Sequence, residues 1–329
     1  MRNSLEEILR QQVVRQQVLL AEAAIRLREH LSMVDICTLF MLVLYAILGV
    51  FHYDKVDYPG ITVAVNLTLS IALVGLALAD GYAPSQSVTL VRKFFLLPGV
   101  FFVYAQAHVF IQHVNPTDVD AVLIKLDYSI WGTHPTRWAA QFANPVLTEI
   151  LQVCYFLYFW IPLFLGLELY ARKDMHAFMY YAFVLAFGFY ISYLLYFLAP
   201  AVGPRLTLHD FSRYQTELPG LWLTPVLRGI VDHGTGIANS VNPFLTAHRD
   251  CMPSGHTMIT IINVVTAFRV RSSARWLFVV IGVGIVLSTI YLRYHYTVDV
   301  MAGVFWAILT LAAAPRLRAW FLRKGFKQA

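Results

Sequence analysis

Long hydrophobic segments recur through most of this chain, and they constrain its fold more than any other feature. A helix of about 20 apolar residues spans the roughly 30 Å of hydrocarbon in a bilayer. Hydrophobic residues make up 58% of the sequence and charged residues 13%, a balance that excludes a water-soluble domain of this length. We therefore predict an all-α, polytopic membrane bundle of about eight transmembrane helices. The predicted spans are 33–52, 61–80, 95–112, 146–170, 176–200, 256–270, 276–292 and 298–314.

The spans divide the chain into four parts. Residues 1–32 carry apolar positions at helical spacing with Arg and Gln between them, which predicts an amphipathic helix on the membrane surface and not a cleaved signal peptide. A partner-binding helix is the alternative. Residues 33–94 hold two peripheral spans, residues 95–314 form a six-helix domain with the candidate site, and residues 315–329 form a basic tail.

Basic residues are distributed unevenly between the two membrane faces. Alternating the loops places the N-terminal segment, the loops at 92–93, 172–173 and 269–275, and the C-terminal tail on one face. By the positive-inside rule this face, with both termini, is cytoplasmic. The loops on the outer face are 53–60, 113–145, 201–255 and 291–296. Topology and anionic lipid then explain the net charge of +6, so we expect no nucleic-acid partner.

Polar side chains able to perform chemistry gather in three segments of this outer face. The segments are 200–205, 249–256 and 293–299. They are far apart in sequence, but each begins or ends a predicted span, so we expect them to converge at one end of the bundle. A helix from His256 to Arg271 is only about 22 Å long, shorter than the hydrocarbon core, so we expect the site to lie within the outer leaflet.

His295 and Asp299 are four residues apart, which places them on one face of a helix. The carboxylate can then accept a hydrogen bond from the imidazole and fix its tautomer, which leaves the other ring nitrogen free to attack phosphorus. The same spacing arises often by chance, and a structural pair at the membrane interface explains it at least as well.

The segment Pro253-Ser254-Gly255-His256 precedes a predicted helix. Gly255 permits close approach of the backbone, and Ser254 supplies a hydroxyl and an N–H, so this corner can hold an anion. His256, as an imidazolium at the start of the helix, can protonate a leaving alcohol. In the simpler interpretation, His256 only faces the lipid headgroups.

Arginine supplies the bidentate contacts that a phosphoryl group needs in a partly dehydrated pocket. Arg205 and Arg293 are the best-placed candidates, and Gly203 and Pro204 fix the chain just ahead of Arg205. Both arginines are also compatible with a role as interfacial anchors, which is our prediction for Arg249.

Two of these motifs resemble those of the type 2 phosphatidic acid phosphatase superfamily, including its branch similar to inositol phosphorylceramide and sphingomyelin synthases. They are Cys-Met-Pro-Ser-Gly-His-Thr at 251–257 and His-Tyr-Thr-Val-Asp at 295–299, in that order and separated by one helical hairpin. The resemblance covers about residues 200–299. It implies a metal-free phosphohistidine mechanism in which His295 is the nucleophile, Asp299 orients it and His256 is the general acid. Ser254 and Gly255 would hold phosphate oxygens.

The arginine pattern departs from that of the superfamily. Leu198 occupies the position of the usual lysine, and Thr289 occupies the position of the usual arginine six residues before the nucleophile. These departures lean slightly toward the phosphotransferase branch.

The resemblance implies an enzyme that acts on a lipid phosphate within the bilayer. We predict a lipid phosphatase that hydrolyses a phosphomonoester or diphosphate. One alternative is a phosphodiester transferase that moves a phospho-headgroup onto a lipid hydroxyl, and another is a non-catalytic membrane binding or transport protein. The three cysteines are scattered, and His256, His295 and Asp299 lack a fourth metal ligand, so we predict neither metal nor cofactor. The segment 206–250 is a candidate lid, and the sequence predicts no particular oligomeric state.

Overall fold

The computed structural model describes residues 14–16, 22 and 27–326. These described residues form helices and connecting segments without a β-strand among them, which confirms the all-α prediction. The amphipathic helix predicted for residues 1–32 falls mostly on positions outside the described residues.

Four helices are each long and apolar enough to span a bilayer. They are α2 (Met33–Phe51), α3 (Pro59–Tyr82), α10 (Met175–Leu198) and α17 (Thr297–Arg323). Two bent pairs raise the number to six if each pair forms one span. The pairs are α4 (Gln86–Phe94) with α5 (Leu96–Val114), and α8 (Pro145–Leu157) with α9 (Trp160–Ala171). The polytopic helical bundle is thereby confirmed.

Two further helices, α15 (Gly255–Arg269) and α16 (Arg275–Tyr291), correspond to the remaining predicted spans. They contain 15 and 17 residues, which at 1.5 Å per residue gives about 22 and 25 Å. Both are shorter than the hydrocarbon thickness. By length and composition, the described residues therefore give up to six of the eight predicted spans, and α15 and α16 are the two that fall short.

In each bent pair, a proline lies near the start of the second helix, close to the bend. The angles are 41° between α4 and α5 and 48° between α8 and α9. Pro98 and Pro162 each lie in the first turn of the second helix, a position that tolerates a residue without an N–H donor. Each break therefore lets one span change direction without leaving many backbone groups unpaired.

Helix α10 occupies the centre of the bundle, where it packs against α2, α5, α9, α15 and α17. Side chains on all sides of α10 are buried, including Tyr181, Phe183 and Ala186, as expected for a helix in an interior. The Thr38 and Tyr190 hydroxyls lie 3.0 Å apart and join α2 to α10. Helix α3 packs mainly against α2 and is mostly exposed.

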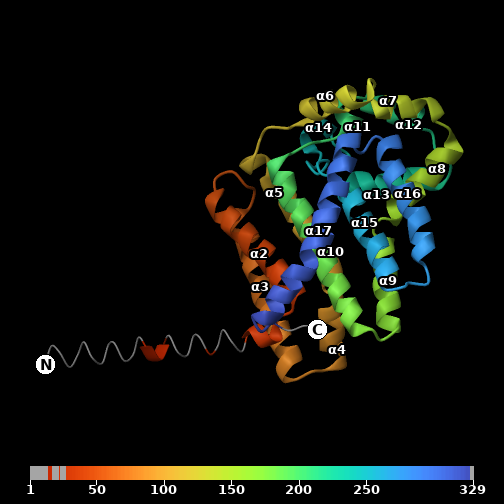
Figure 1. Cartoon of the computed structure of the whole chain (residues 1–329). Helices are drawn as coiled ribbons and strands as arrows, with labels where there is room; N and C mark the ends of the chain where they lie inside the picture. The colour runs from red at the N-terminus through yellow and green to blue at the C-terminus, as the bar shows by residue number, and fades with distance from the viewer. Residues whose placement is uncertain (1–13, 17–21, 23–26, 327–329) are drawn as a thin grey trace.

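Short helices cover one end of the bundle (Figure 1). They are α6 (Asp120–Trp131), α7 (Pro135–Ala139), η1 (Ala140–Phe142), α11 (Pro204–Thr207), η2 (Phe211–Arg213), α12 (Tyr214–Glu217), α13 (Leu223–Gly234) and α14 (Pro243–Thr246). We call this layer the cap. The cap exposes large aromatic side chains, among them Tyr128, Trp131 and Trp138, a composition typical of a membrane interface.

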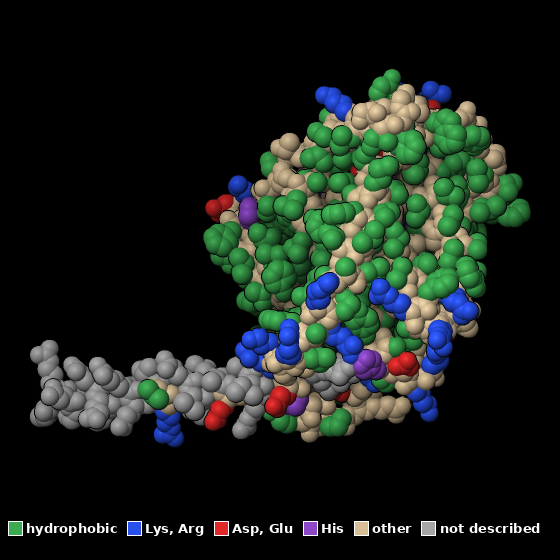
Figure 2. Space-filling view, in the orientation of Figure 1, with side chains coloured by type: hydrophobic (Ala, Val, Ile, Leu, Met, Phe, Trp, Pro, Cys, Tyr) green, Lys and Arg blue, Asp and Glu red, His purple; other side chains and the backbone are tan. Residues whose placement is uncertain are grey.

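Lysine and arginine gather at the opposite end of the bundle. Figure 2 shows them below a broad hydrophobic band, at the level of α4 and of the C-terminal end of α17. Arg92 is buried there and lies 2.7 Å from both Asp35 and Asp80. Helix α17 extends to Arg323, beyond the predicted end of the last span, and so carries the beginning of the predicted basic tail. The cap and the basic end therefore lie on opposite sides of the apolar band.

Candidate active site

The first turn of α15, the segment just before α17 and the short helix α11 of the cap meet at one place. Helices α15 and α17 pack directly against each other, and the ring centroids of His256 and His295 are 5.6 Å apart. Both histidines border one cavity of about 40 Å³ together with Arg205. Three segments that are distant in the sequence thus supply a nucleophile candidate, an acid candidate and a cation to a single space.

His295 is held by a carbonyl as well as by a carboxylate. Its Nδ1 lies 2.9 Å from the Cys251 carbonyl oxygen and 3.6 Å from Asp299 Oδ2, so the hydrogen bond goes to the carbonyl and the carboxylate contributes mainly its charge. A carbonyl can only accept, so Nδ1 carries the proton and Nε2 keeps its lone pair. The tautomer of His295 is therefore the predicted one, but the Cys251 carbonyl fixes it, and the spacing of His295 and Asp299 does not reveal this contact.

Asp299 is engaged by two other donors. The Tyr296 N–H and the Cys251 thiol each donate to Asp299 Oδ2 at 2.8 Å, while Asp299 Oδ1 is buried without a hydrogen-bond partner in the described structure. Burial raises the pKa of the Cys251 thiol, and the charge of Asp299 raises it further, so the sulfur keeps its proton. Cys251 therefore holds both members of the histidine–aspartate pair, one through its carbonyl and the other through its thiol.

His256 is part of a stack of planar groups. Its ring lies against Tyr155, with centroids 4.3 Å apart, and against Tyr158, with centroids 4.1 Å apart. Tyr155 in turn stacks on Tyr294 at 4.3 Å, and the Arg205 guanidinium lies 4.7 Å from the centre of the Tyr294 ring. The stack fixes the acid candidate relative to the arginine, since each ring restricts the next.

Ser254 and Gly255 build the turn that carries His256. Ser254 caps α15, since its hydroxyl oxygen accepts from the Thr257 N–H at 3.3 Å, and the Ser254 N–H donates to the Asp299 carbonyl at 3.0 Å. A Cβ on Gly255 would lie 2.7 Å from the Tyr196 hydroxyl, which leaves no space for a side chain. Neither residue borders the cavity; both place the N-terminal end of α15 beside it.

Arg205 borders the cavity and is buried, with 5% of its surface exposed. One of its terminal nitrogens donates to Asp232 at 2.8 Å. Gly203, two residues earlier, has a φ of +100°, and a Cβ there would lie 2.7 Å from the Tyr294 carbonyl oxygen. A glycine is therefore needed at position 203 to bring Arg205 beside Tyr294.

The structure places the other two arginines elsewhere. Arg293 is buried, does not border the cavity, and donates to Glu217 at 2.7 Å. Arg249 donates to Asp118 and to the Ala247 carbonyl. Of the three arginines weighed in the sequence, Arg205 alone borders the cavity.

Metal-ligand side chains form two groups in the described part of the chain. The first contains Cys251, His295 and Asp299, whose atoms bond mainly to one another, as described above. The second contains His108, His248 and Asp250, and two of its members, His248 and Asp250, border the catalytic cavity.

A profile described as the PAP2 superfamily matches residues 121–313, more than half of the chain. The chain belongs to the PAP2 superfamily. A curated relative of this PAP2 protein is the phosphoinositol dihydroceramide synthase of Bacteroides thetaiotaomicron, which is 26% identical over 211 residues, covering 60% of this chain and 67% of the relative. No solved structure gives a significant match.

These matches confirm the predicted resemblance and the predicted enzyme class. The PAP2 protein is a multi-pass membrane enzyme of the phosphatase or phosphotransferase type that acts in lipid phosphoryl transfer. This enzyme class includes both hydrolysis of a lipid phosphate and its transfer to a second lipid.

Two carboxylates of α6 that support the site of the PAP2 protein were not predicted from the sequence. Asp120 accepts from the backbone N–H groups of Val202 and Gly203 at 2.9 Å and from the Tyr296 hydroxyl at 2.8 Å. Asp127 accepts from the Thr297 and Val298 N–H groups at 3.0 and 2.9 Å, at the start of α17. Their spacing of seven residues places both on one face of a helix, and this was the signal available in the sequence.

A third carboxylate, Glu149 of α8, binds the backbone of the cap. Its carboxylate accepts from the Leu221, Leu223 and Thr224 N–H groups at 2.9, 2.6 and 3.1 Å. Glu149 therefore caps the start of α13 and ties the segment 206–250 to α8.

Proposed function

We propose that this protein is a phosphodiester transferase, which moves a phospho-headgroup from a phospholipid to the hydroxyl of a second lipid through a phosphohistidine at His295. The observation that carries the proposal is the geometry of His295, whose Nδ1 is bonded to the Cys251 carbonyl while the ring borders the same cavity as His256 and Arg205. The choice of transfer over hydrolysis is supported by the similarity to a protein named as a synthase.

In the first step, Nε2 of His295 attacks phosphorus. The P–N bond forms as the bond to the lipid alcohol breaks, and His256 gives its proton to the departing oxygen. The products are a neutral diacylglycerol and a headgroup phosphate bound to His295. Asp299, 3.6 Å from Nδ1, stabilises the positive charge that develops on the ring.

In the second step, the hydroxyl of the acceptor lipid enters where diacylglycerol left. His256, now neutral, takes the hydroxyl proton, the new P–O bond forms, and the P–N bond breaks to restore His295. Water in the acceptor position would give hydrolysis by the same chemistry. The outcome is therefore decided by which hydroxyl reaches phosphorus.

Arg205 is proposed to bind the phosphate oxygens. One of its nitrogens bonds to Asp232, and the remaining donors of the guanidinium are available for an anion. Ser254 and Gly255 contribute through the turn that aims the positive end of α15 at the cavity. Arg293 is proposed to position the cap through Glu217, since it does not border the cavity.

Access for lipids is supported by an apolar cavity of about 650 Å³ between α7, α8 and α16. Leu151 of α8 and Tyr291 line this apolar cavity. One turn further along α8, Tyr155 borders the catalytic cavity, so the two cavities lie along the same helix. We further propose that the basic end of the bundle faces the cytoplasm and that the cap faces the outer side. A lipid would then keep its tails in the outer leaflet while its phosphate reaches His295.

The proposal is tested with the full-length protein in lipid nanodiscs. A phospholipid labelled in its headgroup phosphate is supplied with either ceramide or diacylglycerol. We expect a new labelled lipid, diacylglycerol release, and label trapped on the wild-type protein but not on His295→Asn. His113→Asn is the matched control, because His113 is exposed near the C-terminal end of α5 and does not border the cavity. Labelled water-soluble headgroup phosphate without a new lipid would make the enzyme a hydrolase, and full activity of His295→Asn would overturn the covalent mechanism.

A further inference from the structure

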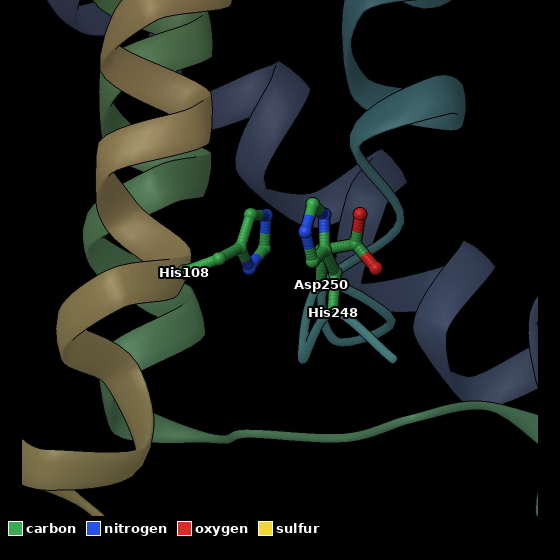
Figure 3. A group of neighbouring side chains, drawn as sticks. All are labelled: His108, His248 and Asp250. Carbon is green, nitrogen blue, oxygen red and sulfur yellow. The ribbon is translucent and has the colours of Figure 1, made fainter. Parts of the chain in front are cut away.

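A second polar group adjoins the catalytic cavity. His108 comes from α5, whereas His248 and Asp250 come from the segment between α14 and α15 (Figure 3). One nitrogen or oxygen of each side chain lies within 4.8 Å of those of the other two. The mechanism proposed above uses none of the three.

Asp250 faces the cavity without a cation. Among the described residues its carboxylate accepts one side-chain hydrogen bond, from the Tyr104 hydroxyl, and forms no ion pair. Its neighbour Arg249 is paired with Asp118 instead. A partly buried carboxylate of this kind needs a donor, because a charge removed from water is costly unless it is bonded.

His108 and His248 differ in their partners, because His248 Nδ1 lies 3.3 Å from the Tyr104 hydroxyl whereas His108 has no hydrogen-bond partner among the described residues. Their rings are stacked with centroids 3.6 Å apart and planes 12° apart, an arrangement that two imidazolium ions would not adopt. Burial lowers the pKa of His248. Both ring nitrogens of His108 are buried without a hydrogen-bond partner in the described structure. A neutral imidazole has one donor and one acceptor, so His108 lacks both an acceptor for its N–H and a donor to its other ring nitrogen.

The stacking disfavours a metal ion as the missing partner. A metal binds imidazole along the lone pair, which lies in the plane of the ring. Because the two rings are nearly parallel, their lone pairs run side by side and do not converge on one point. A hydroxyl group meets the requirements of the cluster better, since it donates to a carboxylate or ring nitrogen and accepts from a ring N–H.

The reaction geometry indicates which hydroxyl this is. His295 and the departing or arriving alcohol occupy opposite sides of phosphorus, and the alcohol lies near His256. Three other substituents surround phosphorus. In a phosphomonoester all three are unesterified oxygens, which a carboxylate without a cation repels, whereas in a phosphodiester one of them carries the headgroup.

We propose that Asp250, His248 and His108 form a subsite for the hydroxyl groups of an uncharged, polyol-type headgroup. The proposal rests on the phosphodiester transferase function proposed above. The subsite selects hydroxylated headgroups over trimethylammonium headgroups, which offer the carboxylate no hydrogen-bond donor, and selects phosphodiesters over phosphomonoesters. Tyr104 positions the carboxylate of Asp250.

The test compares four donor lipids in nanodiscs with ceramide as the acceptor. The donors are phosphatidylinositol, phosphatidylglycerol, phosphatidylcholine and phosphatidic acid. For the wild type, we expect kcat/KM for at least one hydroxylated donor to exceed that for phosphatidylcholine at least tenfold. Asp250→Asn keeps the shape of the side chain and the contact with Tyr104 but removes the negative charge. It should lower kcat/KM for the hydroxylated donor at least tenfold. Phosphate release from phosphatidic acid should be unchanged or higher. Asp57→Asn, at an exposed carboxylate between α2 and α3, is the matched control.

A loss for the hydroxylated donor without a loss for phosphatidic acid cannot come from misfolding, which would lower both. An equal loss for all four donors in Asp250→Asn, or equal use of phosphatidylcholine and the hydroxylated donors by the wild type, would overturn the subsite. His108→Phe, which retains the stacked ring, should raise KM for the hydroxylated donor, and an unchanged KM contradicts a role for His108. Donor preference that is lost with a chelator and restored by Zn²⁺ would replace the hydroxyl group with a metal ion.

The two proposals fail in distinguishable ways. Release of headgroup phosphate in the same donor order, but without a new lipid, would refute the transferase and retain the subsite. Transfer at equal rates from every phosphodiester would refute the subsite and retain the transferase. Turnover of phosphatidic acid alone would refute both.

Discussion

Arg205 offers the sharpest test of how this site binds phosphate. The side chain is buried, borders the cavity, and uses one terminal nitrogen to bond Asp232 at 2.8 Å. The remaining donors can make two charge-assisted hydrogen bonds to a phosphate, each contributing about 1.5–3 kcal/mol. Their loss amounts to about 3–6 kcal/mol, which corresponds to a decrease of about 10² to 10⁴ in kcat/KM.

The substitution of Arg205 must not leave the carboxylate of Asp232 without its partner. Arg205→Met alone would strand Asp232, so the variant to measure is Arg205→Met with Asp232→Asn. The matched comparison is Arg293→Met with Glu217→Gln, which removes an ion pair between two residues that do not border the cavity. We expect the second variant to lose less than tenfold.

Lipid turnover is measured in nanodiscs for both double variants, with thermal unfolding as the check on folding. A stable Arg205 variant within tenfold of the wild type would refute the assignment of Arg205 as the phosphate ligand. A loss in the Arg293 variant as large as that in the Arg205 variant would refute the distinction drawn between the two arginines.

The remaining predictions concern the supports of the site and its cofactor requirement. Asp127→Ala removes hydrogen bonds to the first N–H groups of α17 and should cost about 1–2 kcal/mol, detected as a lower Tm; an unchanged Tm contradicts a capping role. Cys251→Ser retains a donor to Asp299 and should keep most activity, whereas Cys251→Val should reduce kcat with little change in KM; equal activities of the two variants would show that the thiol hydrogen bond is dispensable. Turnover should be unaffected by a strong chelator, and a loss that Zn²⁺ or Mg²⁺ reverses would contradict metal-free catalysis.

The helical fold was accessible from the sequence because long apolar segments permit few arrangements in a bilayer. Each of the eight predicted segments corresponds to a helix or a bent pair. What the apolar pattern did not show was the bending within two spans and the shortness of α15 and α16. Hydropathy averages over a window and is insensitive to a break of one or two residues, such as the one at Tyr158 and Phe159.

The candidate site was accessible in part. Short motifs with a recognisable spacing contain His256, His295 and Asp299, and this spacing indicated their roles. Arg205 directly follows a glycine and a proline that fix the direction of the chain. The partners of these residues come from distant segments. Nothing near Arg205 in the sequence indicates Asp232, and the hydrogen bond from His295 to the Cys251 carbonyl involves a backbone atom that every residue possesses.

Arg293 shows what closeness in sequence does not reveal about the direction of a side chain. Arg293 is two residues from His295, but its φ is +64°, so the chain turns between them and the guanidinium points to Glu217 instead of the cavity. A left-handed residue other than glycine is not predictable from a single sequence.

The attachment of α17 to α6 has a consequence for how this enzyme responds to its surroundings. Asp120 and Asp127 fasten the segment around Tyr296 to a helix whose outer surface carries exposed Tyr128 and Trp131. We therefore expect a change in lipid packing or in detergent that shifts α6 to displace the segment that carries His295 and Asp299. On this basis, the lateral pressure of the surrounding lipid is expected to influence the catalytic rate.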